Sequence, residues 1–162
     1  TIIKIVIKRK VKIMKKLINT NKKASFEYFI IETFEAGIVL VGSEVKAIRD
    51  KSCQIAESYI QIKNNELYIF NMNIPEYTLG NLFNHEPTRI RKLLMHKKEI
   101  LKMSMKIKKE GMTIIPLKIY FNDDNKVKLE IALAKGKHVA DKRASIKEKD
   151  VKRDILKNHK DR

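Results

Sequence analysis

The stretch MTIIPLKIYFNDDNKVKLEIALA, residues 112–134, decides the fold of this chain. Apolar and polar residues alternate on both sides of Asp123-Asp124-Asn125, as they do in strands that bury one face. Asp and Asn favour turns, so the sequence predicts a β-hairpin formed by residues 112–121 and 126–134. The chain is therefore organised around a sheet.

Two further regions carry strand patterns. Residues 58–63 and 67–71 flank Asn64-Asn65, which predicts a second hairpin around that pair. Residues 26–41 predict either one long bent strand or two short strands that break at Ala36-Gly37. Residues 74–87 contain Gly, Asn and Pro and predict a long loop.

Helix patterns occur at two places in the body. Gly42-Ser43-Glu44 begins a short predicted helix, with Val45 and Ile48 facing inward. Residues 89–109 predict the one long helix, because apolar residues recur every three or four positions and Gly111 follows. Its other face is strongly basic. We therefore expect an α+β, mainly β protein: an oligonucleotide-binding-like β-barrel with about three helices and a basic C-terminal tail.

The formal charge of +17 is concentrated at the two ends of the chain. Residues 1–23 carry +9, residues 24–134 only +2, and residues 135–162 carry +6. Basic arms around a nearly neutral body are typical of proteins that bind nucleic acid. An A/T-rich genome is a competing explanation, since it enriches Lys, Ile and Asn without selection for RNA binding. The nearly neutral body favours RNA binding.

Residues 135–162 form a basic tail with eleven Lys or Arg, five Asp or Glu, and few large apolar residues. Such a segment buries too little surface to offset its ordering entropy, so we expect it to be disordered when free. Ser145-Ile146-Lys147-Glu148 resembles a capping box, and Glu148 with Lys152 forms a helix-supporting pair. We expect the tail to become helical on an anionic partner; a solvated tail without a function is the alternative.

The first thirteen residues differ from the rest. Met14 opens a plausible start, so we expect residues 1–13 to be a non-native or upstream-translated extension and residues 14–134 to be the barrel domain. The apolar run in residues 1–13 is short and interrupted by Lys, so it does not predict a membrane span.

The sequence carries no catalytic or metal motif. Cys53 is the only cysteine, which fits a reducing cytoplasm, and it has no nearby His partner. The four histidines lack ligand spacing, and there is no Gly-rich phosphate loop. We expect a binding protein without enzyme activity, metal or cofactor.

A series of short motifs follows the order found in the SsrA-binding protein (SmpB) family, and the resemblance covers residues 16–157. The motifs are Asn21-Lys22-Lys23-Ala24, Glu27-Tyr28-Phe29-Ile30, Phe34-Glu35-Ala36-Gly37, Gly42-Ser43-Glu44-Val45-Lys46-Ala47-Ile48-Arg49, Gly80-Asn81, His85-Glu86-Pro87, Arg89-Ile90-Arg91-Lys92-Leu93-Leu94, Asp141-Lys142-Arg143 and Ile146-Lys147-Glu148-Lys149-Asp150.

The resemblance implies a bacterial cytoplasmic protein with an oligonucleotide-binding-like barrel. Proteins of this family bind the tRNA-like domain of transfer-messenger RNA (tmRNA) and deliver it to stalled 70S ribosomes for trans-translation. Their tail enters the empty mRNA channel near the decoding centre, contacts rRNA and becomes helical there. No membrane is implied, and we expect one protein per RNA.

The same resemblance implies site residues. Asn21, Glu35 and Leu94 match positions that the family uses for RNA binding. For Leu94 core packing is a competing explanation, and for Glu35 a solvated strand end. We expect RNA contacts from Asn21, Lys23, Glu35, Lys46, Arg49, Arg91 and Leu94, and ribosome contacts from Lys137, His138, Asp141, Lys142, Arg143, Lys147 and Lys149.

Two positions depart from the family pattern. Many relatives have His where this chain has Phe26, which changes one expected surface contact. The residue before Asp141 is usually His or an aromatic that stacks on an rRNA base, and here it is Ala140. We expect His138 to replace that stacking residue if the tail shifts.

Two other functions remain open at this point. A general single-strand binder would need an aromatic platform, and the five Tyr and six Phe form no cluster outside core spacing. A small ribosomal protein would also be basic with disordered arms. A pulldown separates the three: one dominant structured RNA, mixed RNA, or constant ribosome stoichiometry.

Overall fold

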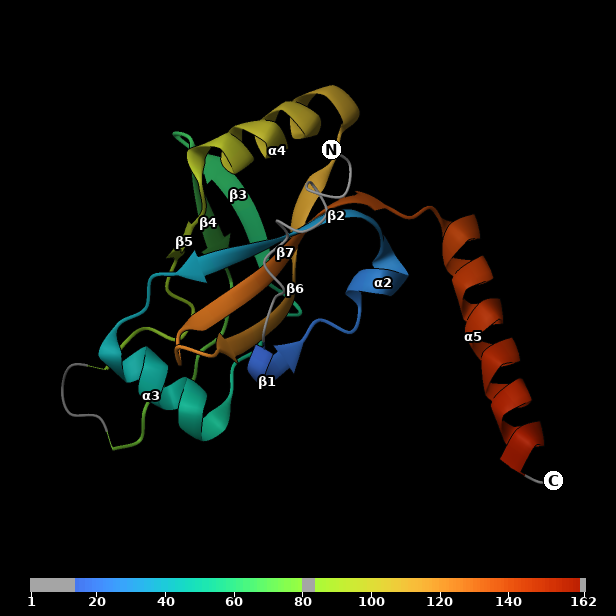
Figure 1. The fold of residues 1–162 in the computed structure, drawn as a ribbon, viewed down its shortest axis with the longest axis horizontal. Helices are drawn as coiled ribbons and strands as arrows, with labels where there is room; N and C mark the ends of the chain where they lie inside the picture. The colour runs from blue at the N-terminus through green and yellow to red at the C-terminus, as the bar shows by residue number, and fades with distance from the viewer. Residues whose placement is uncertain (1–13, 80–83, 161–162) are drawn as a thin grey trace, which may run out of the picture.

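A computed structural model describes residues 14–79 and 84–160 and contains a seven-stranded antiparallel sheet (Figure 1). The extension predicted at residues 1–13 lies outside the described residues. The strand order is β1-β6-β3-β4-β5-β2-β7, and β6 also pairs with β7, which closes the ring into the expected barrel. The strands are β1 (Met14–Thr20), β2 (Tyr28–Ile38), β3 (Tyr59–Lys63), β4 (Glu66–Phe70), β5 (Arg91–Leu94), β6 (Thr113–Asn122) and β7 (Val127–Gly136).

Both predicted hairpins are confirmed. β6 pairs with β7 from Thr113 opposite Ala134 to Phe121 opposite Val127. The β3–β4 turn has Asn64 and Asn65 at φ 51° and 60°, the left-handed pair of conformations that suits a tight hairpin. β2 continues through Ala36-Gly37, so the single-strand alternative is the correct one.

The long predicted helix at residues 89–109 is wrong over its first part. The helix is α4 (Lys97–Glu110), and the residues before it form β5, which pairs with β4 and β2. Arg91 and Leu93 point into the barrel and Leu94 points out, a period of two that the sheet pairing selects over the helical period. Gly111 ends α4 at φ 63°, as predicted.

Helices close the two ends of the barrel around its core. α3 (Gly42–Lys51) buries Ala47 and Ile48 at one end, and α4 buries Ile100 and Met103 at the other (Figure 1). The short α2 (Ala24–Glu27) packs outside, where Ala24 contacts β6 and β7 residues. The core inside the barrel is mainly aliphatic, with Phe121 and several Met residues, and the strands contribute their inward residues to it.

A buried ion pair joins α3 to β5. The side chains of Glu44 and Arg91 are both fully buried, and Arg91 Nε donates a hydrogen bond to Glu44 Oε2. Arg91 Nη1 donates to Met72 O at 2.6 Å and Nη2 donates to Pro87 O at 3.1 Å. The guanidinium therefore ties α3 to the backbone at Met72 and Pro87.

Glu44 is stabilised as a carboxylate. Its Oε1 accepts hydrogen bonds from the Arg89 guanidinium at 2.5 Å and from the Val41 amide at 2.9 Å, which also caps α3. Burial raises the pKa of Glu44, but the bonds from Arg89, Val41 and Arg91 outweigh burial and hold the pKa below its usual value.

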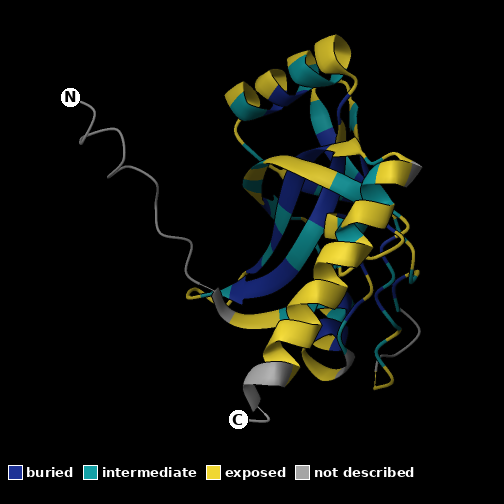
Figure 2. Cartoon of the chain, turned by 90° about the vertical axis from the view of Figure 1, so that its right-hand side faces the viewer, coloured by how far each residue is buried: buried dark blue, intermediate teal, exposed yellow. Residues whose placement is uncertain are grey.

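The C-terminal tail forms the helix α5 (Val139–Lys160), which projects from the barrel (Figure 1), and most of its described side chains are exposed (Figure 2). The capping box predicted at Ser145 is wrong, because the helix begins six residues earlier. Asp141 Oδ2 instead accepts a hydrogen bond from the His138 amide at 3.2 Å, and Ser145 Oγ donates to Asp141 O inside the helix. Disorder of the free tail remains a prediction.

The helices of the described chain include none that is both long and apolar enough to cross a membrane.

Candidate nucleic-acid interface

The strand registers bring two predicted RNA-binding residues, Glu35 and Leu94, onto one outer surface of the barrel, and a third, Asn21, lies at its edge. A first row runs across β1, β6, β7 and β2, where Thr20 lies opposite Lys118, Lys118 opposite Glu130, and Glu130 opposite Glu35. Asn21 follows Thr20 at the start of this row. Residues far apart in the sequence therefore meet because they share one face of neighbouring strands.

A second row lies beside the first and extends it to β5. It pairs Leu17 with Tyr120, Tyr120 with Lys128, Lys128 with Gly37, and Gly37 with Leu94. We call the outer surface formed by these two rows the β2–β7 face. Figure 1 shows β2 and β7 side by side on the front of the barrel.

Glu35 is an exposed carboxylate that the protein holds in one orientation. The Tyr120 phenol donates a hydrogen bond to Glu35 Oε2, reaching across β7 from β6. Burial and this hydrogen bond raise the pKa of Tyr120, so the phenol remains a donor at all ordinary pH values. Glu35 Oε1 has no partner among the described residues and is available to accept from an RNA donor.

Leu94 lies on the surface of the barrel and is not part of its core. Its side chain is 52% exposed, whereas Leu93 is 1% exposed and belongs to the core. Leu94 lies against Gly37, where an added Cβ would come within 3.3 Å of Leu94 Cβ and 3.7 Å of Lys128 Nζ. Gly37 therefore keeps the surface flat beside Leu94, and an apolar contact is presented next to Lys128.

Asn21 is more deeply engaged in the fold than its prediction as an RNA contact requires. Its amide Nδ2 donates to Pro116 O at 3.0 Å and its backbone N–H donates to Leu117 O at 2.8 Å. Its Oδ1 is buried without a hydrogen-bond partner in the described structure. Substituting Asn21 would disturb the β1–β6 junction as well as any RNA contact.

Three other predicted basic residues lie outside the rows of the β2–β7 face. Lys23 Nζ is 2.8 Å from Glu57 Oε1, and both side chains are exposed. Glu57 raises the pKa of Lys23 through its hydrogen bond and its charge. On α3, Lys46 Nζ lies 5.7 Å from the centre of the Tyr77 ring.

Arg49, also on α3, lines an open pocket of about 420 Å³ with Lys16, Phe121 and Asn125. Phe121 and Lys16 pair across β6 and β1, so this pocket borders the end of the β2–β7 face. Two cations at that border are suitably placed for a phosphate that runs past the edge of the face.

Arg91 does not fit its prediction as an RNA contact. Its side chain is fully buried and its guanidinium is engaged by Glu44, Met72 and Pro87. It has no exposed surface with which to bind RNA in this structure. The family motif around Arg91 is accounted for by the buried ion pair.

The tail joins the barrel through Lys137. Its Nζ donates to Ser25 O at 3.0 Å and to Ser145 Oγ at 2.8 Å, and it lies 4.9 Å from the centre of the Phe29 ring. Its backbone N–H donates to Glu27 O at 2.8 Å. Lys137, predicted to bind the ribosome, is thus a link between α2, β2 and α5 in this structure.

Phe26 provides a second contact to the tail. It lies in α2 rather than in the predicted strand, and Lys142 Nζ sits 5.9 Å from the centre of its ring. A cation above an aromatic face is attracted by the ring electrons. Phe26 is therefore a contact between α2 and the tail in this structure.

The remaining tail residues that were predicted to bind the ribosome are mostly exposed. His138, Arg143, Lys147 and Lys149 have exposed side chains, whereas Asp141 is half-buried at the first turn of α5. The chemistry of these groups suits phosphate oxygens and exposed bases.

Several residues of the interface escaped the sequence analysis. Tyr120, Lys118 and Lys128 alternate with core positions in β6 and β7, and that alternation was the available signal.

The sequence analysis also did not predict an aromatic pair on the outside of β3 and β4. Tyr59 and Phe70 stack there, with ring centres 5.2 Å apart. The expectation that no aromatic cluster stands outside the core is therefore wrong.

The described residues contain neither a cluster of metal-binding side chains nor a reactive cysteine. Across residues 14–79 and 84–160, no three His, Cys, Asp or Glu side chains lie together as a metal site requires. Cys53 is buried, and burial raises the pKa of its thiol to about 12. A thiol with that pKa is not a nucleophile at neutral pH.

Comparison with known proteins identifies the family. The model of the SmpB protein family matches residues 18–161. An SsrA-binding protein of Azorhizobium caulinodans is 50% identical over 155 residues, covering 96% of this chain and 97% of that protein. An SsrA-binding protein of Thermosipho africanus is 54% identical over 140 residues, covering 86% and 94%.

A solved structure agrees with the sequence comparison. It is described as "tmRNA-SmpB: a journey to the center of the bacterial ribosome", and the matched chain is 40% identical with a TM-score of 0.62. The match covers 75% of this chain and 85% of that chain. The chain belongs to the SmpB protein family.

Proposed function

We propose that this protein binds the tRNA-like domain of tmRNA and delivers it to stalled 70S ribosomes for trans-translation. The observation that carries the proposal is the β2–β7 face, where strand register places Glu35 and Leu94 on one outer surface and Asn21 follows Thr20 at its edge. Relatives about 50% identical over nearly the whole chain are SsrA-binding proteins, and the solved neighbour is tmRNA-SmpB with the bacterial ribosome.

The chemistry of the face suits structured RNA. Folded RNA is read through its shape, its phosphates and its unpaired bases. Glu35 accepts from base amino groups, as a carboxylate does with cytosine, while Leu94 packs against a base or sugar. Lys118 and Lys128 lie in the same rows, and Lys16 and Arg49 lie at the border for phosphate contacts.

The tail supplies the ribosomal part of the function. We propose that α5 enters the vacant mRNA channel near the decoding centre, where His138, Asp141, Lys142, Arg143, Lys147 and Lys149 contact rRNA. Its eight Lys or Arg against four Asp or Glu make it basic enough for a channel lined by phosphate. The protein acts in the bacterial cytoplasm as a binding protein without a catalytic step.

A pulldown from the native cell tests the function. We expect tmRNA to be the dominant recovered RNA. Ribosomes should also be recovered, but without a constant ratio of ribosomes to this protein. Recovery of mixed RNA would instead indicate a general single-strand binder. One copy on every ribosome would indicate a ribosomal protein.

Changes on the β2–β7 face test how the RNA is bound. Glu35→Ala should weaken binding to the tRNA-like domain by about 10- to 100-fold, because a hydrogen bond to a charged group contributes roughly 1.5–3 kcal/mol. Tyr120→Phe should weaken it less, since Glu35 stays but loses its orientation. Leu94→Ala should also weaken binding while leaving the free energy of unfolding within about 1 kcal/mol, because Leu94 is exposed.

Binding and unfolding are measured on the same samples, by titration with labelled RNA and by thermal melts. Glu110→Gln serves as the control, because Glu110 is an exposed carboxylate at the end of α4 and lies outside both rows. A Leu94→Ala protein that melts much earlier but binds RNA normally would contradict the surface role of Leu94.

Salt dependence tests the electrostatic part of the proposal. The logarithm of affinity for the tRNA-like domain should fall linearly with the logarithm of salt concentration, with a slope of roughly −0.7 to −0.9 per phosphate neutralised. Arg49→Gln should reduce the steepness by about one phosphate if the border pocket holds one. A nearly flat slope would mean that the positive charge serves solubility alone.

A further inference from the structure

The outer face of the β3–β4 hairpin carries an aromatic stack that the β2–β7 face does not use. Tyr59 and Phe70 pair directly across the two strands, and their ring planes differ by 5°. Lys63 Nζ lies 4.9 Å from the centre of the Phe70 ring, so a cation, a phenyl ring and a phenol form one assembly. Tyr59 is its exposed end, with 48% of its surface open to solvent.

A purely structural role would not require so much exposure. Cross-strand aromatic pairs stabilise hairpins, and Tyr59 with Phe70 does so here. The neighbouring outward residues are Gln61, Lys63, Glu66 and Tyr68, all of them polar at their tips. An exposed phenol held in place by a second ring is a preformed surface on which another flat group can stack.

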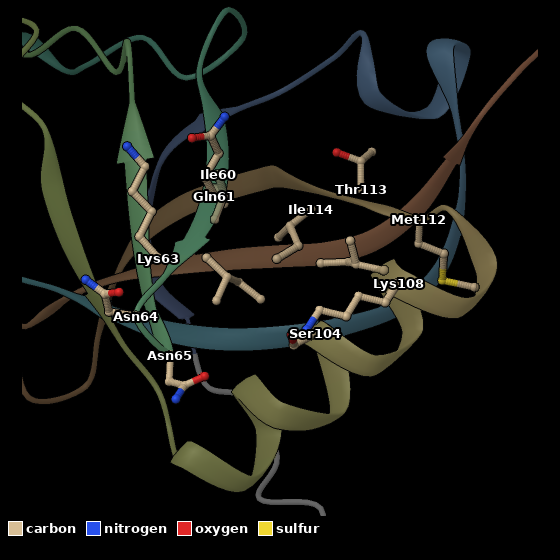
Figure 3. A pocket seen from close by; sticks show the side chains of 12 residues that line it. Ile60, Gln61, Lys63, Asn64, Asn65, Ser104, Lys108, Met112, Thr113 and Ile114 are labelled. Carbon is tan, nitrogen blue, oxygen red and sulfur yellow. The ribbon is translucent and has the colours of Figure 1, made fainter.

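Lys63 connects this stack to a groove. The groove has a volume of about 550 Å³, within the range of pockets that hold small ligands, and lies between the hairpin and α4 (Figure 3). Its hairpin wall includes Gln61, Lys63, Asn64 and Asn65, and Lys108 of α4 lies across from them. The floor is apolar and consists of Ile60, Ile62, Ile107, Met112 and Ile114.

The groove exists because β3 and β6 diverge. They pair at Ile60 opposite Ile114, and past this pair the C-terminal half of α4 covers the opening. α4 contributes six Lys against two Glu, so the wall facing the hairpin belongs to a basic helix. An apolar floor beneath Lys and amide groups complements a nucleotide chain, which carries flat bases and anionic phosphates.

We propose that the Tyr59–Phe70 stack and the adjoining groove form a second RNA-binding site, which holds an unpaired segment of ribosomal RNA. One base stacks on Tyr59, and the following phosphates lie along Lys63 and Lys108. Aromatic side chains with nearby cations are the usual means of holding unpaired RNA. The proposal rests on the proposed function, which supplies ribosomal RNA as the second RNA partner.

The position of the stack selects ribosomal RNA over tmRNA. In the closed ring β6-β3-β4-β5-β2-β7, β3 lies across from β2 and β4 lies across from β7. Figure 1 accordingly shows β3 and β4 behind β2 and β7. The stack and Glu35 therefore face opposite sides of the barrel, and an RNA domain bound on one side leaves the other free for a different RNA.

The first test uses a short single-stranded oligoribonucleotide with a central adenosine and a matched oligonucleotide that is abasic at that position. The full chain should bind the adenosine form about 5- to 150-fold more tightly, because stacking adds to affinity while the phosphates stay the same. Tyr59→Phe should retain this preference and Tyr59→Leu should lose it. Ring-proton NMR shifts of Tyr59 on the unmutated protein report stacking even where a variant folds poorly.

The second test separates the two RNA partners. Tyr59→Leu should weaken binding of the full chain to 70S ribosomes and leave affinity for the tRNA-like domain unchanged, whereas Glu35→Ala should do the reverse. If the Glu35→Ala protein binds the tRNA-like domain as well as the parent, the result counts against RNA binding by the β2–β7 face. It does not contradict the proposal for the Tyr59–Phe70 stack. The inference is overturned if abasic and intact oligonucleotides bind alike, if Tyr59→Leu affects only the tRNA-like domain, or if Tyr59→Leu changes self-association instead.

Discussion

A chain that ends at His138 should still bind the tRNA-like domain of tmRNA but support no tagging of proteins on stalled ribosomes. The barrel is complete without α5, because β7 ends at Gly136 and Lys137 secures the end of the chain through Glu27 O and Ser25 O. Among the described residues, α5 meets the body where Lys142 lies over Phe26 and where Ser145 bonds Lys137. Removal of the tail should therefore reduce RNA affinity only through lost Lys and Arg.

The loss of tagging follows from the role proposed for α5 in the empty mRNA channel. Replacing Asp141, Lys142 and Arg143 together by Ala should have the same effect as truncation, since charge-assisted bonds to rRNA are lost. Asp141→Asn is the matched control, because an amide oxygen still caps the His138 N–H while the charge is gone. Full tagging by the truncated chain would contradict the proposed mechanism.

The state of the tail has its own measurement. NMR of the free chain should show fast motion beyond residue 138 if the tail is disordered alone, with helix formation on the ribosome. His138→Ala should reduce tagging if His138 stacks on an rRNA base in place of the missing aromatic. Ala140→Tyr should then be neutral, and it should improve tagging if His138 does not stack.

The hairpins were predictable because their signals are local. The Asn64-Asn65 turn and the alternation around residues 123–125 depend on neighbouring residues alone, and both hairpins form as expected. Strand β5 was not predictable in this way. Its four residues fit a helical period as well as a strand period, and only pairing with β2 and β4 decides between them.

The candidate interface shows the same division. Family motifs pointed to Glu35 and Leu94, but not to Tyr120, which orients Glu35 from a different strand. Tyr59 and Phe70 are eleven positions apart in the sequence and become a pair only through hairpin register. Sequence spacing does not contain cross-strand register, so contacts of this kind require the structure.

Arg91→Ala should destabilise the folded barrel by about 3–5 kcal/mol, because it leaves the Glu44 carboxylate buried with half of its charge partners gone. That is a large part of the roughly 5–15 kcal/mol that holds a domain of this kind together. The carbonyl groups of Met72 and Pro87 would also lose their donors. Chemical denaturation with detection by circular dichroism measures the change.

Controls distinguish loss of a buried charge pair from loss of packing. Replacing both partners, with Glu44→Gln and Arg91→Met, should recover part of the stability, since neither charge then remains buried alone. Lys23→Gln removes an exposed ion pair with Glu57 and should leave the unfolding midpoint unchanged. An Arg91→Ala protein as stable as the parent would mean that the pair contributes nothing to the fold.

Acid should weaken the barrel through the same carboxylate. The pKa of Glu44 is lower in the folded chain than the usual value of about 4.3, so the unfolded chain binds the proton more readily. The contribution of Glu44 to stability is then fully present above that usual value and disappears as the pH falls through the lowered pKa of the folded state. Glu44→Gln should be less stable at neutral pH but lose less stability between pH values of about 5 and 3, because its side chain no longer takes up a proton on unfolding. The Glu44–Arg91 pair joins α3 to β5, which pairs with β2. Strands β5 and β2 should therefore be the first strands of the β2–β7 face to lose amide-exchange protection as the pH falls.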